Sequence, residues 1–296
     1  MSNNDTGFIK FLILLLVLGL TSGLSACQKQ QSQIYHDNEA DSILGGKQVS
    51  ASSIFSQRVI YLTIGTSKKS SLCTASALTP NILLTAAHCV KGFASSQIKA
   101  VLSANPRDQN LSSSEQIQIE KIIIHEQYRD ETKQRGVLHH DLALLKLAKP
   151  IAAQRVSRLA QAEQTSAFLN LVSIGYGKKT ALFDPSPESI AMDKESPQLY
   201  FVMKTVTGYK KESETFNINQ NDMTGVCSGD SGGPGFIYDE EASDFFIVGV
   251  TSYISVTKAE KEQFDPDEIY DKCIGHGYYS NVTFYRDWIE SNISGL

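Results

Sequence analysis

The 296-residue sequence has little of several features that mark specialised classes of protein. It has no basic surplus, since 27 Lys and Arg face 32 Asp and Glu, so a nucleic-acid partner is not expected. Its apolar run at 11–20 is too short to span a bilayer, which takes about 20 residues. With 41% hydrophobic residues, 20 Gly and 8 Pro, the chain is neither collagen-like nor globally disordered. These absences leave a globular protein, either one large two-lobed domain or two medium domains.

The N-terminal region carries the features of an export signal. The run FLILLLVLGL at 11–20 fits the hydrophobic core of a signal peptide. The small residues before Cys27 resemble the lipobox of bacterial lipoproteins, a resemblance that implies cleavage before Cys27 and attachment of lipid to it. The alternative is an ordinary secretory signal with an incidental cysteine. We therefore predict a lipoprotein signal peptide at 1–26 and a polar tether or propeptide at 27–42.

Cysteine is scarce, and no Cys-x-x-Cys unit is present. Apart from Cys27, four cysteines remain, and they allow three disulfide pairings. Disulfides persist in exported proteins, so two bridges are expected. His139 and His140 adjoin Asp141, but no third ligand stands at a metal-site spacing, so they are expected to be loop histidines. Neither a metal nor a cofactor is expected. The four cysteines are Cys73, Cys89, Cys227 and Cys273.

From Ile43 onward the sequence consists mainly of short segments rich in β-branched and aromatic residues. This pattern predicts an all-β barrel or sandwich fold, not a parallel sheet covered by helices. One helix is predicted at 284–292, with Trp288 and Ile289 facing inward. Long loops are predicted at 127–140, 178–197, 207–226 and 255–276. The predicted strands are 58–66, 72–78, 82–86, 116–125, 142–147, 168–175, 199–206, 235–238, 245–253 and 278–282.

Three stretches of the sequence supply, in chain order, a histidine, an aspartate and a serine. Together these residue types can carry out hydrolysis by a serine nucleophile. A serine hydroxyl is a poor nucleophile unless an imidazole takes its proton, and the imidazole needs a carboxylate to fix its tautomer. Any one of the stretches can arise by chance, but the three together indicate one converging site. They are TAAHC at 85–89, DLALLKL at 141–147 and CSGDSGGP at 227–234.

These motifs resemble the chymotrypsin/trypsin family of serine proteases over 43–296. Further landmarks of the family are ILGG at 43–46, GYG at 175–177 and YRDWI at 285–289. The resemblance implies an all-β fold of two antiparallel six-stranded β-barrels with a C-terminal helix. The barrels are expected at roughly 43–150 and 151–296, with the site in the cleft between them.

The resemblance also assigns roles to individual residues. It makes His88 the general base, Asp141 its orienting carboxylate and Ser231 the nucleophile. The backbone N–H groups of Gly229 and Ser231 would form the oxyanion hole, which stabilises developing negative charge. The disulfides implied by the family are Cys73–Cys89 and Cys227–Cys273.

Activation follows from the same resemblance. Cleavage before Ile43 would create a new N-terminal ammonium that pairs with Asp230, so a zymogen is expected. Ser42 precedes the cut where the family usually has Lys or Arg, so the activating protease is not expected to be trypsin-like. Its identity stays open. The cut would also free the domain from a membrane anchor at Cys27, releasing it to the periplasm or medium.

The specificity pocket is expected to be uncharged. By resemblance Gly225 lies at its base, where a trypsin-like enzyme has an aspartate for Lys and Arg. Ser252, Tyr253 and Ile254 would form one wall, with Gly277 opposite. Ile254 is expected to narrow the pocket, so small or medium apolar residues should precede the scissile bond in protein or peptide substrates.

Two other functions share much of this sequence pattern. A catalytically silent homologue would act as an anchored binding module, but such proteins usually lose a member of the triad, and here none is lost. The same triad also attacks esters. Labelling with a serine-directed fluorophosphonate separates an enzyme from a silent homologue.

Overall fold

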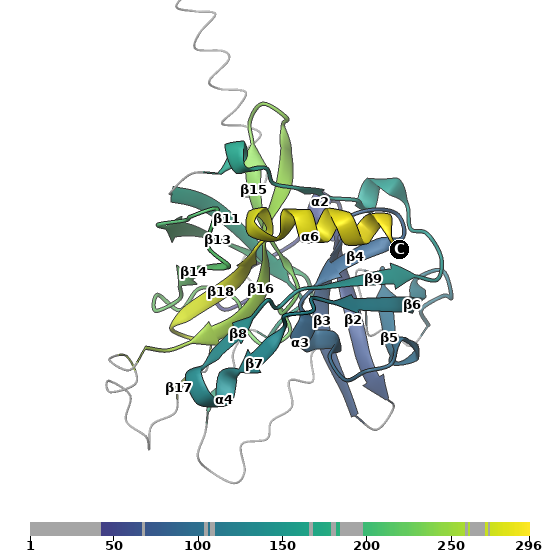
Figure 1. Ribbon diagram of the computed structural model, residues 1–296, viewed down its shortest axis with the longest axis horizontal. Helices are drawn as coiled ribbons and strands as arrows, with labels where there is room; N and C mark the ends of the chain where they lie inside the picture. The colour runs from purple at the N-terminus through teal and green to yellow at the C-terminus, as the bar shows by residue number, and fades with distance from the viewer. Residues whose placement is uncertain are drawn as a thin grey trace, which may run out of the picture. The chain divides into compact units, whose positions relative to one another are not determined.

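The computed structural model describes residues 43–66, 69–103, 106, 110–165, 168–178, 182–183, 198–257, 260, 270–271 and 273–296 (Figure 1). The expected signal peptide, Cys27 and the tether lie outside the described residues, as does most of the loops expected at 178–197 and 255–276. Among the helices in the described part of the chain, none has both the length and the apolar character to cross a membrane.

The first half of the described chain forms a closed six-stranded barrel with antiparallel neighbours throughout. Its β-branched and leucine side chains fill the interior, as in β4, where every residue is buried. Closure leaves no exposed sheet edge. Around the barrel the strands are β2 (Val59–Thr66), β3 (Lys69–Ala77), β4 (Ile82–Thr85), β9 (Ala143–Leu147), β6 (Gln116–Ile124) and β5 (Ile98–Val101).

The second half forms an eight-stranded sheet instead of the expected six-stranded closed ring. Two short strands account for the difference. β1 (Lys47–Gln48) pairs with one end of β13, and β10 (Arg158–Leu159) pairs in parallel with β16. The path begins at β1 and continues through β13 (Tyr200–Thr207), β11 (Phe168–Gly175), β15 (Pro234–Asp239), β16 (Asp244–Ser255), β18 (His276–Asn281) and β14 (Thr215–Asn219).

The segment before the first barrel packs on the second sheet. Lys47 pairs with Phe201 of β13, although 43–150 was expected to form the first barrel. In the short helix α2 (Ile54–Arg58), the Phe55 ring lies 5.6 Å from the Phe236 ring and 4.8 Å from the Phe245 ring. The segment before β2 therefore belongs structurally to the second sheet, because its aromatic side chain packs there.

The C-terminal helix α6 (Val282–Ser294) is longer than the expected 284–292. Its first N–H groups are capped by the Asn281 side chain, which accepts from the Thr283 N–H at 3.1 Å. Ile289 is fully buried, whereas Trp288 is partly exposed and donates its indole N–H to Glu126 at 2.8 Å. The expected inward orientation thus holds fully for Ile289 alone. Figure 1 shows α6, in yellow, running from the second sheet towards the first barrel.

Several short elements occur where loops or no element were expected. The loop at 127–140 contains a small hairpin closed by one helical turn, and the loop at 207–226 contains β14. Segments of two to five residues carry too little periodicity to be seen in a sequence. They are β7 (Arg129–Glu131), α4 (Thr132–Arg135), β8 (Val137–His139), α3 (Ala87–Val90), β12 (Leu182–Phe183), β17 (Tyr270–Asp271) and the 3-10 helices Ser95–Gln97, Ala153–Arg155 and Ala162–Gln164.

Candidate active site

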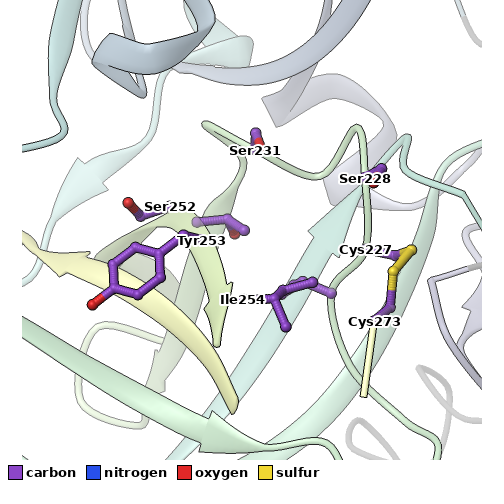
Figure 2. Close-up of a pocket in the computed structure, with 9 residues that line it drawn as sticks. Cys227, Ser228, Ser231, Ser252, Tyr253, Ile254 and Cys273 are labelled. Atoms are coloured by element: carbon purple, nitrogen blue, oxygen red, sulfur yellow. A yellow bond between two sulfur atoms is a disulfide. The ribbon is translucent and has the colours of Figure 1, made fainter. Parts of the chain in front are cut away.

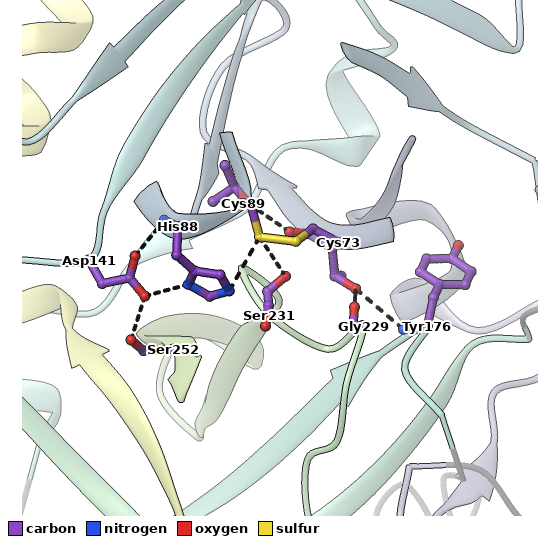
Figure 3. Close-up of a disulfide and its surroundings, with 10 residues drawn as sticks. Cys73, His88, Cys89, Asp141, Tyr176, Gly229, Ser231 and Ser252 are labelled. Carbon is purple, nitrogen blue, oxygen red and sulfur yellow. Dashed lines mark hydrogen bonds and ion pairs between the residues drawn. A yellow bond between two sulfur atoms is a disulfide. The ribbon is translucent and has the colours of Figure 1, made fainter. Parts of the chain in front are cut away.

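His88 is positioned by the buried strand that precedes it. β4 ends at Thr85, and His88 follows within the single turn α3. Both carboxylate oxygens of Asp141 contact His88: Oδ1 accepts the backbone N–H at 2.8 Å, and Oδ2 lies 2.7 Å from ring Nδ1 (Figure 3). Since Nδ1 donates to a carboxylate, Nε2 is left as the nitrogen that can accept a proton.

Asp141 is buried and held by a second donor. The residue is 2% exposed, and Oδ2 also accepts the Ser252 hydroxyl at 2.5 Å. Burial alone would raise the pKa of Asp141, but attraction to His88 and the hydrogen bonds from His88 and Ser252 outweigh it and lower the pKa. Asp141 therefore stays ionised at neutral pH. The sequence assigned Ser252 to the pocket wall alone and gave no sign of this bond.

The environment of His88 favours its protonated form. Burial would lower the pKa of the imidazole, but the Asp141 carboxylate raises it by charge and by hydrogen bonding, with a further contribution from Asp130. Together these effects raise the pKa of His88 above its ordinary value of 6.5. A ring in this state is a better base than free histidine and can stabilise the positive charge gained on taking a proton.

Ser231 lies on the loop between Cys227 and β15, next to the His88 ring (Figure 3). Both residues lie against the Cys89 sulfur, with His88 Nε2 at 3.8 Å and the Ser231 carbonyl at 3.7 Å. The Ser231 carbonyl accepts the Thr74 N–H at 2.8 Å, which ties the serine to the first barrel. Although both residues are described, no hydrogen bond joins Ser231 Oγ to His88 Nε2; such bonds often tighten only with substrate bound.

Gly232 lets the serine loop approach the first barrel closely. Its φ of +80° is in the left-handed region. A Cβ at this position would overlap the Thr85 hydroxyl and the Thr74 carbonyl. The Gly232 N–H donates to Thr251 of β16 at 2.7 Å, so the loop is held from both halves of the domain.

The N–H groups of Gly229 and Ser231 are oriented by the carbonyls that share their peptide planes. In a trans peptide the N–H points opposite to the C=O, so anchoring each carbonyl turns the N–H the other way. Within the described residues neither N–H donates to a protein acceptor, and both are available to an incoming oxyanion. The anchors are Ser228 O to Lys178 N at 2.9 Å and Asp230 O to Gly233 N at 2.8 Å.

Asp230 is a fully buried carboxylate behind the serine loop. Its oxygens accept the Gly177 N–H at 2.7 Å and the Cys227 N–H at 2.8 Å. Gly175 and Gly177 make room for it, because a Cβ on either would overlap the carboxylate. Burial raises the pKa of Asp230 to about 7, and the two N–H groups offset only part of that rise.

Ile43 is also fully buried, packed in a small cluster with Tyr200 and Val202. The next residue, Leu44, accepts the Gly225 N–H at 2.9 Å through its carbonyl. The segment that would follow the expected cleavage is thus already packed in the continuous chain.

A pocket of about 220 Å³ opens beside Ser231 (Figure 2). The three residues expected in its wall, Ser252, Tyr253 and Ile254, all line it. Gly225 and Gly277 are not among the residues that line this pocket, and the Gln220 side chain fills the space that a side chain on either glycine would take. The other lining residues are Val226, Cys227, Ser228, Ser231, Thr251 and Cys273.

Two disulfides are present, with the pairing that the resemblance implied. Cys73–Cys89 has a Cα–Cα distance of 6.3 Å and lies beside His88, and Cys227–Cys273 has one of 5.1 Å and lies at the pocket. Cys73, His88 and Cys89 bring three potential metal ligands together, but the two sulfurs are bonded to each other and are not thiolates.

His139 and His140 lie near acidic and aromatic side chains. His139 ends β8, whereas a loop was expected, and its Nδ1 lies 3.4 Å from Glu214 Oε2. The His140 ring stacks on His125 at 4.8 Å. Burial would raise the pKa of Glu214, but the hydrogen bond from the His140 backbone N–H, attraction to the His140 ring and the hydrogen bond with His139 lower it. Glu214 was not among the residues that the sequence motifs indicated.

The paired β-sheets and the serine, histidine and aspartate at their junction define a trypsin-like serine protease domain. The trypsin family model matches residues 43–289, so the chain belongs to the trypsin family. Similar proteins include human atrial natriuretic peptide-converting enzyme, 27% identical over 236 residues that cover 75% of this chain and 20% of that protein. Transmembrane protease serine 11G of Mus musculus is 27% identical, covering 75% of this chain and 50% of that protein.

Phenoloxidase-activating factor 1 of Holotrichia diomphalia is 24% identical over 275 residues, covering 86% of this chain and 71% of that protein. The chain thus spans about a fifth of the first of these relatives and half of the second. The matched region thus makes up a different share of each of the three relatives.

Proposed function

We propose that this chain is an exported serine endopeptidase that hydrolyses peptide bonds through His88, Asp141 and Ser231. The observation that carries the proposal is the double contact of the buried Asp141 carboxylate with His88, at 2.8 Å and 2.7 Å, on the side of the ring away from Ser231. A silent homologue has no need to keep a buried carboxylate aligned with a histidine that faces a serine.

The proposed reaction has two halves. The Ser231 hydroxyl attacks the scissile carbonyl carbon while His88 Nε2 takes its proton, and the resulting oxyanion accepts the N–H groups of Gly229 and Ser231. The carbon–nitrogen bond then breaks, and His88 returns the proton to the leaving amine. A water molecule, deprotonated by His88, hydrolyses the acyl-serine by the reverse steps. Ester substrates would react by the same route.

The substrates proposed are proteins or peptides, without Lys or Arg before the scissile bond. None of the described residues that line the pocket is a carboxylate that could pair with a cation, and Ile254 projects a branched side chain from its wall (Figure 2). Two relatives are named as a peptide-converting enzyme and a phenoloxidase-activating factor. We propose that the present chain likewise acts on proteins or peptides.

We also propose that the protein is made as an exported precursor. Cleavage between Ser42 and Ile43 would place an ammonium near the buried Asp230, whose pKa is raised by burial and whose oxygens accept two backbone N–H groups. Lipid on Cys27 would hold the precursor on a membrane, and the cut would release the domain from it. The activating protease is not identified by any feature of the chain.

A fluorophosphonate probe tests the catalytic proposal directly. Wild-type protein is expected to label at Ser231 and to hydrolyse peptide and ester substrates. Ser231→Ala should abolish both with an unchanged urea unfolding curve, while Ser294→Ala, on the far end of α6, should change neither. If Ser231→Ala kept even a hundredth of wild-type turnover, Ser231 would not be the nucleophile.

Fractionation tests the export proposal. Cys27→Ser should move the precursor from the membrane fraction to the soluble fraction, and N-terminal sequencing of the active species should begin at Ile43. Activity confined to membrane-bound chains that begin at Cys27 would refute the coupling of activation to release.

A further inference from the structure

Gln220 is a fully buried polar residue directly behind the pocket. It follows the last residue of β14, and its backbone N–H donates to the Gly275 carbonyl at 2.7 Å. A glutamine this deep needs partners for both ends of its amide, because an unpaired buried amide is costly.

The Gln220 amide is tied to both sides of the pocket. Its Nε2 donates one N–H to the Val226 carbonyl at 3.0 Å and the other to the Cys273 carbonyl. Both N–H groups of the amide are therefore used. Its Oε1 accepts the Val226 N–H at 2.9 Å. Val226 and Cys273 both line the pocket. The side chain is therefore fixed in place and is not a flexible group that a substrate can push aside.

The same amide lies against the two glycines that were expected at the base of the pocket. A Cβ on Gly225 would overlap Gln220 Cγ and Cδ, and a Cβ on Gly277 would overlap its Oε1. Gly225 and Gly277 have no side chains, and the Gln220 side chain occupies the space that such side chains would take. The pocket of about 220 Å³ is accordingly lined by the residues on the outer side of this amide.

We propose that Gln220 is a specificity-determining residue that closes the base of the pocket and restricts the residue before the scissile bond to a small side chain. This inference rests on the proposed function and deepens it. Alanine, serine or valine would fit above the amide, whereas an aromatic ring would collide with it.

The amide also disfavours Lys and Arg for a second reason. Both N–H groups of Gln220 are used, so a cation reaching the base would meet a single carbonyl oxygen that already accepts a bond. A buried cation needs a paired anion. Both the length and the positive charge of a Lys or Arg side chain therefore disfavour its binding in the pocket.

The first experiment uses the wild-type chain. Peptide substrates that differ in one position, with Ala, Val, Leu, Phe or Lys before the scissile bond, are compared by kcat/KM. We expect Ala or Val to exceed Phe and Lys at least tenfold, in line with the roughly 10- to 200-fold effect of one methylene in an apolar pocket. A preference for Phe, Leu or Lys overturns the inference, and so does a flat profile.

Two variants then test the residue itself. Gln220→Ala removes the obstruction, so the ratio of kcat/KM for Phe to that for Ala should rise at least tenfold. Gln220→Asn keeps an amide but shortens it by one methylene, so the gain should appear with Leu and be smaller with Phe. Gln118→Ala is the matched control, because Gln118 also donates to two carbonyls, at 2.7 Å each, but in the first barrel.

The outcomes separate this inference from the proposed function. If fluorophosphonate fails to label Ser231, the proposed function and this inference fall together. If labelling succeeds but a folded Gln220 variant keeps the wild-type ratio, the inference alone is wrong. Should neither variant fold, the substrate series on the wild-type chain decides the matter.

Discussion

The Ser252 hydroxyl donates to the Asp141 carboxylate at 2.5 Å, from the strand whose next two residues line the pocket. A β-bulge makes this possible. Along β16, Thr251 pairs with Tyr279 and Tyr253 pairs with Tyr278, so Ser252 has no partner of its own on β18. A bulge re-aims a side chain that would otherwise follow the alternation of the strand. One irregularity thus links the orientation of the triad to the wall that receives the substrate.

Ser252→Ala is expected to lower kcat/KM by roughly tenfold, mainly through kcat. A hydrogen bond to a charged group contributes about 1.5–3 kcal/mol, and its loss loosens the carboxylate that orients His88. Steady-state kinetics on the best substrate checks this, with Ser255→Ala on the same strand as the control. An effect confined to KM would instead assign Ser252 to the pocket alone.

The acid limb of the pH–rate profile should report a raised pKa for His88. A protonated imidazole cannot take the Ser231 proton, so kcat/KM should fall as pH drops through a value above 6.5. Asp130→Asn should move this limb to lower pH, because Asp130 helps to raise the pKa of His88. Since Asp130 is exposed, added salt should shrink the difference. An identical limb in both proteins at low salt would contradict the assignment.

Asp230 should make the uncleaved chain less stable as pH rises. Its pKa of about 7 exceeds the ordinary 3.8, so unfolding releases its proton between these values. The contribution of Asp230 to the free energy of unfolding is therefore fully present below pH 4. It falls by about 4 kcal/mol as the pH rises from 4 to 7.

Urea unfolding of the Ser231→Ala protein against its Asp230→Asn derivative isolates this contribution. The Asn derivative should lose less stability between pH 5 and 7.5, whatever its absolute value. Parallel pH curves for the two proteins would show that Asp230 is already paired in the precursor.

Gly232→Ala should destabilise the protein far more than Gly208→Ala. Both glycines have a positive φ, +80° and +73°, so the backbone strain is similar, at about 1–2 kcal/mol. A Cβ at 208 meets nothing within 4 Å, whereas one at 232 overlaps the Thr85 hydroxyl and the Thr74 carbonyl. Overpacking adds about 1–3 kcal/mol. Urea unfolding in the Ser231→Ala background measures the difference, and equal losses would mean that the serine loop does not press on the first barrel.

The sequence was informative where local pattern decides structure. The ten predicted strands all correspond to observed ones, because each carries a run of β-branched or aromatic residues that a half-buried sheet favours. The residues of the candidate active site could be located because each lies in a short motif. The closed first barrel was also expected, although its closure depends on pairs far apart in the chain, such as Thr85 with Ala143.

The features missed depend on distant contacts. Gln220 lies in the polar stretch NQND, within the loop predicted at 207–226, and its burial depends on hydrogen bonds to the carbonyls of Val226 and Cys273. The role of Ser252 depends on a bulge that alternation cannot reveal. β1 has only two residues and pairs across about 150 positions, so neither it nor the eight-stranded sheet could be expected.

The pairing of β1 with β13 has a consequence for how the precursor would switch on. Lys47, already in register with Phe201, stands four residues after Ile43, since 47 − 43 = 4. A new terminus on so short an arm reaches at most roughly 14 Å from its attachment. If Asp230 lies within that reach, as the proposed activation requires, the new terminus meets it at an effective concentration of about a millimolar or more, whatever the concentration of the protein. Once the chain is cut, docking of the new terminus is unimolecular, so dilution of the enzyme into the medium would not reverse it.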